Sequence, residues 1–142
     1  MNRPLLDSDE EIVKRAGMSI PDLFAKYGEE YFRALETQVL QDLCKESGCI
    51  IATGGGAVLR EENRLAMRQN GRLCLIRRAL ENLPRSGRPL SKSQDALQEM
   101  WNYRKPIYES SMDFSVENNA DKDIVAQTIE EGFYEAVGNE RT

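Results

Sequence analysis

The sequence predicts an α/β fold with a mostly parallel sheet. Short apolar segments alternate along the chain with segments of helical spacing, which is typical of strands joined by crossover helices. Two of the apolar segments, Cys49–Thr53 and Leu73–Ile76, are continuous, as expected of strands buried on both faces. The length of 142 residues predicts a single domain over residues 1–142, since domains commonly contain ~100–150 residues.

Residues typical of helix ends predict the first two helices. A short strand at Pro4–Leu6 is followed by a helix over Glu10–Ala16. Ser19 is a residue type that caps helix amino termini, and Pro21 stands just inside the helix that it would begin. Gly28 is expected to close this second helix.

A long third helix is predicted from about Glu29 to Glu46, with Gly48 ending it. Apolar side chains recur along it at helical spacing, so one face of the helix is expected to pack into the core. The side chains of this predicted core face are Tyr31, Leu35, Val39 and Leu43.

The second half of the chain continues the alternation. Residues 84–94 are rich in Arg, Ser, Gly, Pro and Lys and are interpreted as a mobile loop. The other predicted elements are a helix at Asn63–Gln69, a helix from about Asp95 that Pro106 kinks or restarts, a strand at Phe114–Val116, and an amphipathic helix from Asp123 to about Val137.

The composition excludes several classes of function. There is no histidine, which rules out imidazole bases, histidine-containing catalytic triads and HExxH zinc sites. The three cysteines form no CxxC pair and are expected to be thiols in a reducing compartment. The formal charge of −5 argues against nucleic-acid and anionic-membrane binding, and no segment is apolar for long enough to span a bilayer. We therefore expect a cytoplasmic protein.

Two carboxylates stand where the first strand becomes a loop. Asp7 and Asp9 are two residues apart, so on a strand both would point into one cleft. The carboxyl ends of parallel strands are where α/β sheets bind ligands, and such a pair suits hydroxyl binding and indirect Mg²⁺ contacts. The alternative is a helix N-cap at Ser8 or Asp9, followed by first-turn acids.

Three consecutive glycines, Gly54, Gly55 and Gly56, follow the second apolar strand. Such a triplet lets the backbone approach a ligand closely and direct N–H groups at an anion. The alternative is a flexible turn. The triplet is not a nucleotide-binding P-loop, because neither GxxxxGK[ST] nor GxGxxG occurs anywhere in the chain.

Arg33 lies on the long predicted helix, with Glu36 three residues further on. This spacing lets Glu36 hold the guanidinium, which would then suit bidentate binding of a carboxylate. The alternative is a surface ion pair that contributes little.

Positive charge is concentrated in one region of this acidic chain. Arg85 and Arg88 stand on the predicted loop, as a cationic lid that clamps phosphates would require. Further along the chain, Lys92, Arg104 and Lys105 extend this cationic region. The alternative is a solvated basic loop.

Taken in order, these motifs resemble the shikimate kinases, a family of P-loop small-molecule kinases. The resemblance covers the chain from about Leu5 to its last helix. It rests on motifs that occur in the family's order: LDSD at residues 6–9, GExxFRxxE at 28–36, ATGGGAV at 52–58, RPL at 88–90 and YRxPxY at 103–108.

The resemblance implies an enzyme with the three-layer fold of P-loop kinases and a parallel sheet. The implied reaction is transfer of the γ-phosphoryl group of ATP, with Mg²⁺, to the 3-hydroxyl of shikimate. This reaction belongs to chorismate and aromatic amino-acid biosynthesis. No histidine is needed for it, because phosphoryl transfer relies on positioning and cations.

The resemblance also implies roles for individual residues. Asp9 would bind and orient the shikimate hydroxyls, Asp7 would contact Mg²⁺ through water, and the glycines of residues 54–56 would offer backbone amides to the substrate. Arg33 and Arg104 would grip the shikimate carboxylate, with Glu36 supporting Arg33. The lid, at about residues 84–94, would bring Arg88 onto the phosphates and Arg85 near the nucleotide base.

The chain departs from the family pattern at its beginning. The family starts with a strand, a GxxGxGK[ST] loop and a helix, and none of these precedes the LDSD motif here. We therefore expect the strands near Leu5 and Ile50 to be separated from those near Leu75 and Val116, and residues 1–142 alone to be inactive or poorly folded.

Three interpretations follow from this departure. The first is a shikimate kinase sequence that lacks its first strand–loop–helix unit. The alternative is a non-catalytic shikimate-binding or regulatory domain that has lost nucleotide binding. A third possibility is the tail of a longer or fused polypeptide. The expected ligands are shikimate and ATP, and the expected state is a monomer.

Overall fold

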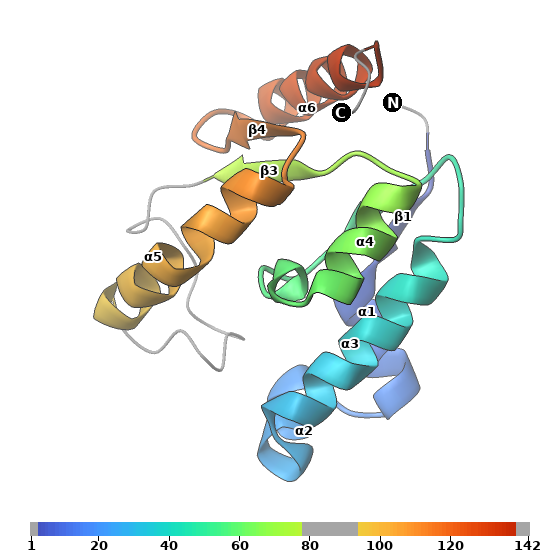
Figure 1. Ribbon diagram of the computed structural model, residues 1–142, viewed down its shortest axis with the longest axis vertical. Coiled ribbons are helices and arrows are strands. Elements are labelled where there is room, and N and C mark those ends of the chain that lie inside the picture. Colours follow the sequence, from blue (N-terminus) through green and yellow to red (C-terminus); the bar gives the residue numbers. More distant parts are fainter. Residues whose placement is uncertain (1–2, 78–93, 139–142) are drawn as a thin grey trace. The chain divides into compact units, whose positions relative to one another are not determined.

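The computed structural model describes residues 3–77 and 94–138 of the chain (Figure 1). The described residues fall into two compact units. Residues 3–71 form the amino-terminal unit, and residues 72–77 with 94–138 form the carboxy-terminal unit. The single domain over residues 1–142 stays a prediction. Of the predicted loop at 84–94, all but Gln94 lies outside the described residues.

The amino-terminal unit contains two short strands, four α-helices and one turn of 3₁₀-helix among its described residues. In chain order these are β1 (Leu5–Asp7), α1 (Ser8–Ala16), α2 (Ile20–Tyr27), α3 (Glu29–Leu43), β2 (Ile50–Ala52), η1 (Ala57–Leu59) and α4 (Glu61–Gln69). The carboxy-terminal unit contains β3 (Cys74–Arg77), α5 (Gln94–Ser111), β4 (Phe114–Glu117) and α6 (Lys122–Gly138).

The strands pair in parallel, as the alternating pattern predicted. β1 pairs with β2, with Leu6 opposite Ile51, and β3 pairs with β4, with Leu75 opposite Ser115. Each pair forms its own two-stranded sheet, and no ladder joins the two sheets within residues 3–77 and 94–138. The α/β class and the expected separation of the two strand pairs are therefore confirmed for the described chain.

The predicted burial of the strands on both faces is wrong. Ile50 in β2 is 39% exposed and Ile76 in β3 is 52% exposed. Side chains alternate between the faces of a strand, and β2 follows this rule, with Ile50 and Ala52 exposed and Ile51 half-buried. A continuous apolar sequence does not show whether both faces of its sheet are covered.

Local capping interactions set the helix boundaries in the amino-terminal unit. The Asp7 carboxylate accepts hydrogen bonds from the N–H groups of Asp9 (2.9 Å) and Glu10 (3.3 Å), so α1 begins at Ser8 rather than at Glu10. Ser19 caps α2 through the N–H of Asp22, as predicted. Gly28 ends α2 with φ of +85°, a conformation that favours glycine.

The core of the amino-terminal unit lies between its first three helices. Its buried side chains come from α1 (Ile12), α2 (Leu23) and α3 (Phe32 and Val39). The rings of Phe24 and Phe32 lie 4.8 Å apart between centroids, which joins α2 to α3.

The predicted core face of α3 is only partly confirmed. Val39 is buried, and Leu35 and Leu43 pack against the core. Tyr31 is 47% exposed and stacks on Tyr27 at the surface, so its predicted core position is wrong. On this turn of the helix the neighbouring Phe32 takes the core position instead.

In the carboxy-terminal unit, α5 and α6 accompany the parallel pair β3–β4. The N–H of Leu73 donates to the Asp113 carboxylate at 2.7 Å, which ties the beginning of β3 to the turn before β4. A Cβ atom at Gly132 of α6 would lie 2.6 Å from the Phe114 ring of β4, so glycine permits close helix–strand packing there. The predicted restart at Pro106 does not occur, because α5 continues through it.

No helix within the described ranges is both long and apolar enough to cross a membrane.

Candidate substrate site

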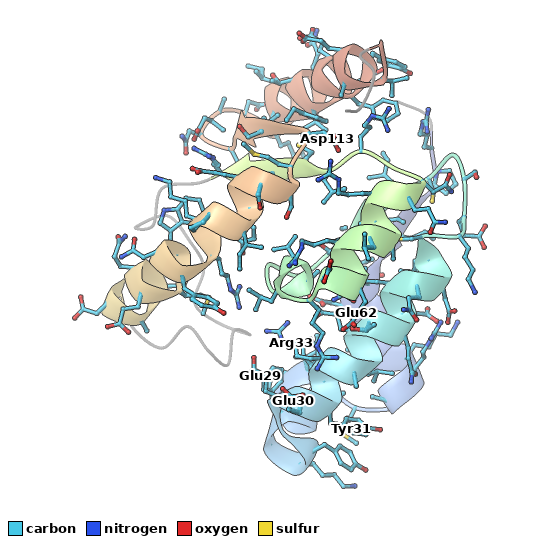
Figure 2. All side chains as sticks on the ribbon, in the orientation of Figure 1. Glu29, Glu30, Tyr31, Arg33, Glu62 and Asp113 are labelled. Carbon is cyan, nitrogen blue, oxygen red and sulfur yellow. The ribbon has the colours of Figure 1, made fainter. Side chains whose placement is uncertain are left out.

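The guanidinium of Arg33 forms one side of the candidate site, on the first two turns of α3 (Figure 2). Its Nη1 donates to Glu36 Oε1 at 3.0 Å. Its Nε and Nη2 both donate to the same oxygen of Glu29, Oε2, at 3.3 Å each. Arg33 is therefore held by one carboxylate three residues after it and by another four residues before it.

The Arg33–Glu36 pair is buried, so the surface ion pair considered as an alternative is excluded. The Arg33 side chain is 10% exposed and that of Glu36 is 1% exposed. The Arg33 guanidinium carbon also lies 5.1 Å from the centre of the Phe32 ring, a cation–π contact. Buried charges are tolerated only when they are paired, and this pairing fixes the direction of the guanidinium.

The glycine triplet packs against this guanidinium. A Cβ atom at Gly56 would lie 2.6 Å from Arg33 Cζ, a separation that real Cβ atoms essentially never show. Gly56 has φ of −85°, and neither Gly54 nor Gly55 is among the residues with positive φ. Glycine at position 56 is thus required for space beside the guanidinium and not for an unusual backbone conformation.

Asp9 also approaches the glycine loop, at Gly54. A Cβ atom at Gly54 would lie 3.4 Å from Asp9 Oδ1 and 3.7 Å from Glu36 Oε2, so both carboxylates approach Gly54. Asp9 belongs to α1 and not to the strand, so the predicted strand geometry, with Asp7 and Asp9 sharing a strand face, is wrong. The helix nevertheless delivers the Asp9 carboxylate to the glycine loop.

The surroundings of Asp9 favour its protonated form. Burial is the largest cause that raises the pKa of Asp9 above its ordinary 3.8, and the nearby charge of Asp7 raises it further. The Arg33 guanidinium acts in the opposite direction and lowers it. A carboxylate in this environment is a stronger proton acceptor than an exposed aspartate.

Asp7 caps α1, and its predicted indirect contact with Mg²⁺ stays a prediction. The alternative of an N-cap at this motif is confirmed, with Asp7 itself as the capping residue rather than Ser8 or Asp9. Within the described residues, no group of three or more acidic, cysteine or histidine side chains is placed to hold a metal ion. Asp7 therefore offers one carboxylate and not a metal cage.

Two side chains that the sequence did not single out hold the segment after the glycines. Asn63 Nδ2 donates to the carbonyl of Ala57 at 2.9 Å, and Arg64 Nη1 donates to the carbonyl of Val58 at 2.5 Å. Asn63 and Ala57 are fully buried. Each bond joins residues only six positions apart. Nothing in the sequence distinguishes Asn63 and Arg64 from ordinary helix residues, so the sequence carries no signal for these contacts.

The remaining predicted site residues belong to the other unit or lie outside the described residues. Arg104 lies half-buried on α5 in the carboxy-terminal unit. Arg85 and Arg88 lie outside the described residues. Their predicted contacts with substrate carboxylate, phosphate and nucleotide base stay predictions.

The arrangement suits a ligand that carries both an anion and hydroxyl groups. Arg33 provides a rigid guanidinium for a carboxylate, and Asp9 provides an acceptor for a hydroxyl proton. The glycine loop lies against both groups and allows a ligand to approach its backbone.

Comparison with known proteins identifies the family of the chain. The family model described as shikimate kinase matches residues 1–133. The chain belongs to the shikimate kinase family. Members of this family are phosphotransferases, so the chain is assigned to an enzyme family and not to a class of binding modules.

Individual shikimate kinases match most of the chain. The shikimate kinase of Dictyoglomus turgidum is 40% identical over 139 residues, which cover 91% of this chain and 80% of that protein. That of Thioalkalivibrio sulfidiphilus is 34% identical over 139 residues, covering 92% and 72%.

Solved shikimate kinases share the fold. The structure from Acinetobacter baumannii, a complex with shikimate, matches with a TM-score of 0.83 and 30% identity, over 91% of this chain and 78% of that one. The structure from Aquifex aeolicus matches with a TM-score of 0.80 and 35% identity, over 97% and 85%.

Proposed function

We propose that the site formed by Asp9, Arg33 and the glycine loop binds shikimate for phosphorylation of its 3-hydroxyl by ATP. The observation that carries this proposal is the meeting of a buried, oriented guanidinium and a carboxylate of raised pKa at one glycine loop. Shikimate presents one carboxylate and several ring hydroxyls, which are the groups that such a pair can bind.

In this proposal Arg33 binds the shikimate carboxylate and Glu36 keeps the guanidinium in place. The 3.0 Å bond from Nη1 to Glu36 lies in the protein interior, so it persists when a ligand arrives. Arg104 would supply a second cation to the same carboxylate. The backbone of Gly54, Gly55 and Gly56 would border the ring.

Asp9 acts at the hydroxyl that is phosphorylated. Its carboxylate accepts the hydroxyl hydrogen and orients the oxygen toward the incoming phosphorus, so that attacking and leaving oxygens are in line. Its raised pKa makes it a better acceptor for the proton that the hydroxyl loses.

The family implies ATP as co-substrate and Mg²⁺ as its companion. Magnesium in kinases is commonly held by one or two carboxylates together with phosphates and water, so the single carboxylate of Asp7 fits an indirect contact. When bound, the ion neutralises charge on the phosphates. Arg88 would close onto the phosphates and Arg85 onto the base.

We also place this reaction in the cytoplasm and expect a monomer.

Substitution of Arg33 tests the proposal. Arg33→Ala removes the carboxylate-binding group and should weaken shikimate binding by at least ~10-fold in calorimetry, because a charged hydrogen-bond pair is worth about 1.5–3 kcal/mol. Gly56→Ala should also weaken it, since the new methyl group would push the guanidinium away. The matched control is Arg15→Ala, which removes a surface arginine paired with Glu11 and Asp42.

Two results would contradict the proposal. The first is the absence of saturable shikimate binding by a folded wild-type chain. The second is an equal effect of the Arg33 and Arg15 substitutions, since only the former lies at the glycine loop. In turnover measurements on a complete enzyme that carries the P-loop, Arg33→Ala should raise the shikimate requirement much more than the ATP requirement.

A further inference from the structure

The second carboxylate on Arg33 has no part in the function proposed above. Glu29 lies in the first turn of α3, one turn before Arg33 (Figure 2). Its side chain is 48% exposed, whereas the side chain of Glu36 is 1% exposed. Arg33 thus has one buried partner and one partner that reaches it from the solvent side.

The contact with Glu29 occupies the edge of the guanidinium that a ligand would use. Nη1 donates one hydrogen to Glu36, and Nε with Nη2 forms a pair of parallel donors that suits a bidentate carboxylate. Both donate to the single oxygen Oε2 of Glu29. An incoming carboxylate and Glu29 therefore compete for the same two nitrogens.

The geometry also shows that the Glu29 contact is the weaker of the two. Its distances are 3.3 Å, longer than the ~2.7–2.9 Å of strong charge-assisted bonds, and the Arg33–Glu36 distance is 3.0 Å. One oxygen shared by two donors cannot point along both N–H directions. A ligand carboxylate with one oxygen for each nitrogen would make the better pair.

We propose that Glu29 is an internal carboxylate that occupies the Arg33 fork in the free protein and is displaced by the carboxylate of the substrate. This inference rests on the proposed function, because it assigns the displacing group to shikimate. Glu29 is then a specificity-determining residue. It keeps the buried guanidinium paired when no ligand is present, and a ligand carboxylate must bind Arg33 more strongly than Glu29 does in order to displace it. It does not contact the reacting atoms.

The test compares Glu29→Gln with Glu30→Gln in shikimate titrations. Glutamine keeps the shape of Glu29 but removes the competing charge, so shikimate binding should tighten by about two- to fivefold, the range of a half-exposed ion pair. Glu30→Gln removes the same charge from the same turn of α3 and should leave shikimate affinity unchanged. Glu30 pairs with Arg60 instead, at 3.1 Å, and its side chain is 94% exposed.

The methyl ester of shikimate separates displacement from a general structural effect. It lacks the anionic carboxylate, so Glu29→Gln should not tighten its binding. Weaker or unchanged shikimate binding by Glu29→Gln would overturn the inference, because Glu29 would then position Arg33 or be irrelevant to it. Equal tightening for acid and ester would also overturn it.

Failure of the proposed function gives a different result. If Arg33→Ala leaves shikimate affinity unchanged, the site assignment itself falls and the role of Glu29 falls with it. If Arg33→Ala weakens binding while Glu29→Gln has no effect, shikimate binding at Arg33 stands and only the displacement is wrong. Circular dichroism on both glutamine variants checks that the helical content is retained.

Discussion

At the scale of single residues, the sequence singled out the groups of the candidate site, but it did not show their burial or why glycine is needed among them. The pairing of Arg33 with Glu36 follows from their spacing on a helix, and the structure confirms it. Burial of that pair could not be predicted, because hydrophobic periodicity assigns charged residues to the solvent face. The glycine triplet suggested backbone freedom, whereas Gly56 is needed for the space that the Arg33 guanidinium fills.

The raised pKa of Asp9 makes a residue-scale prediction about charge. Asp7→Asn should lower the pKa of Asp9, because it removes a negative neighbour while asparagine still caps α1. Arg33→Met should raise it, because the positive neighbour is lost. Carbon-detected NMR titration of the Asp9 carboxyl measures both shifts. Opposite signs, or equal shifts from Glu10→Gln, would contradict this account.

The same shift fixes the sign of a stability effect. A raised pKa means that the folded protein holds the Asp9 proton more tightly than the unfolded chain does. Its contribution therefore favours folding below the ordinary value of 3.8 and is lost as the pH rises through the folded value. Other titrating groups also contribute to the free energy of unfolding. Asp9→Asn should flatten the part of its pH dependence that comes from Asp9.

At the scale of elements, end signals were more predictive than apolar faces. Ser19 and Gly28 mark the limits of α2 as the sequence indicated, because capping depends on a few neighbouring backbone groups. The inward face of α3 depends on what the rest of the chain brings to it. Tyr31 fits the helical period but pairs with Tyr27 at the surface, and no local pattern contains that information.

An element-scale prediction concerns the packing of α1 in the amino-terminal unit. Ile12→Ala should lower the free energy of unfolding by about 2–5 kcal/mol, because Ile12 is fully buried and its removal leaves a cavity. Val13→Ala on the same helix should cost about 1 kcal/mol or less, since Val13 is 38% exposed. Urea denaturation measures both, and equal losses would place the core of this unit elsewhere.

At the scale of the whole molecule, the parallel pairing and the two separate sheets were predicted, but strand exposure was not. Parallel pairing follows from the alternation of strands and helices. The separation of the pair β1–β2 from the pair β3–β4 follows from the family resemblance. Exposure depends on which faces and edges are covered. Ile50 and Ile76 each belong to a continuous apolar segment of the sequence. Such a segment does not show which of its side chains are exposed.

The motif content of residues 1–142 makes a prediction for the molecule as a whole. The chain carries Asp9, Arg33 and Glu36, which are proposed to bind and position shikimate, but no GxxxxGK[ST] sequence. The amides, lysine and hydroxyl of that sequence hold phosphates and Mg²⁺ in P-loop kinases. The formal charge of −5 adds no general attraction for a nucleotide.

In calorimetry, residues 1–142 should bind shikimate and show no saturable ATP binding up to about 1 mM, a concentration at the upper end of common KM values. The shikimate titration of the same preparation is the control for folding. Saturable ATP binding, or shikimate-dependent ATP turnover by these residues alone, would show that phosphate is held by groups other than a P-loop.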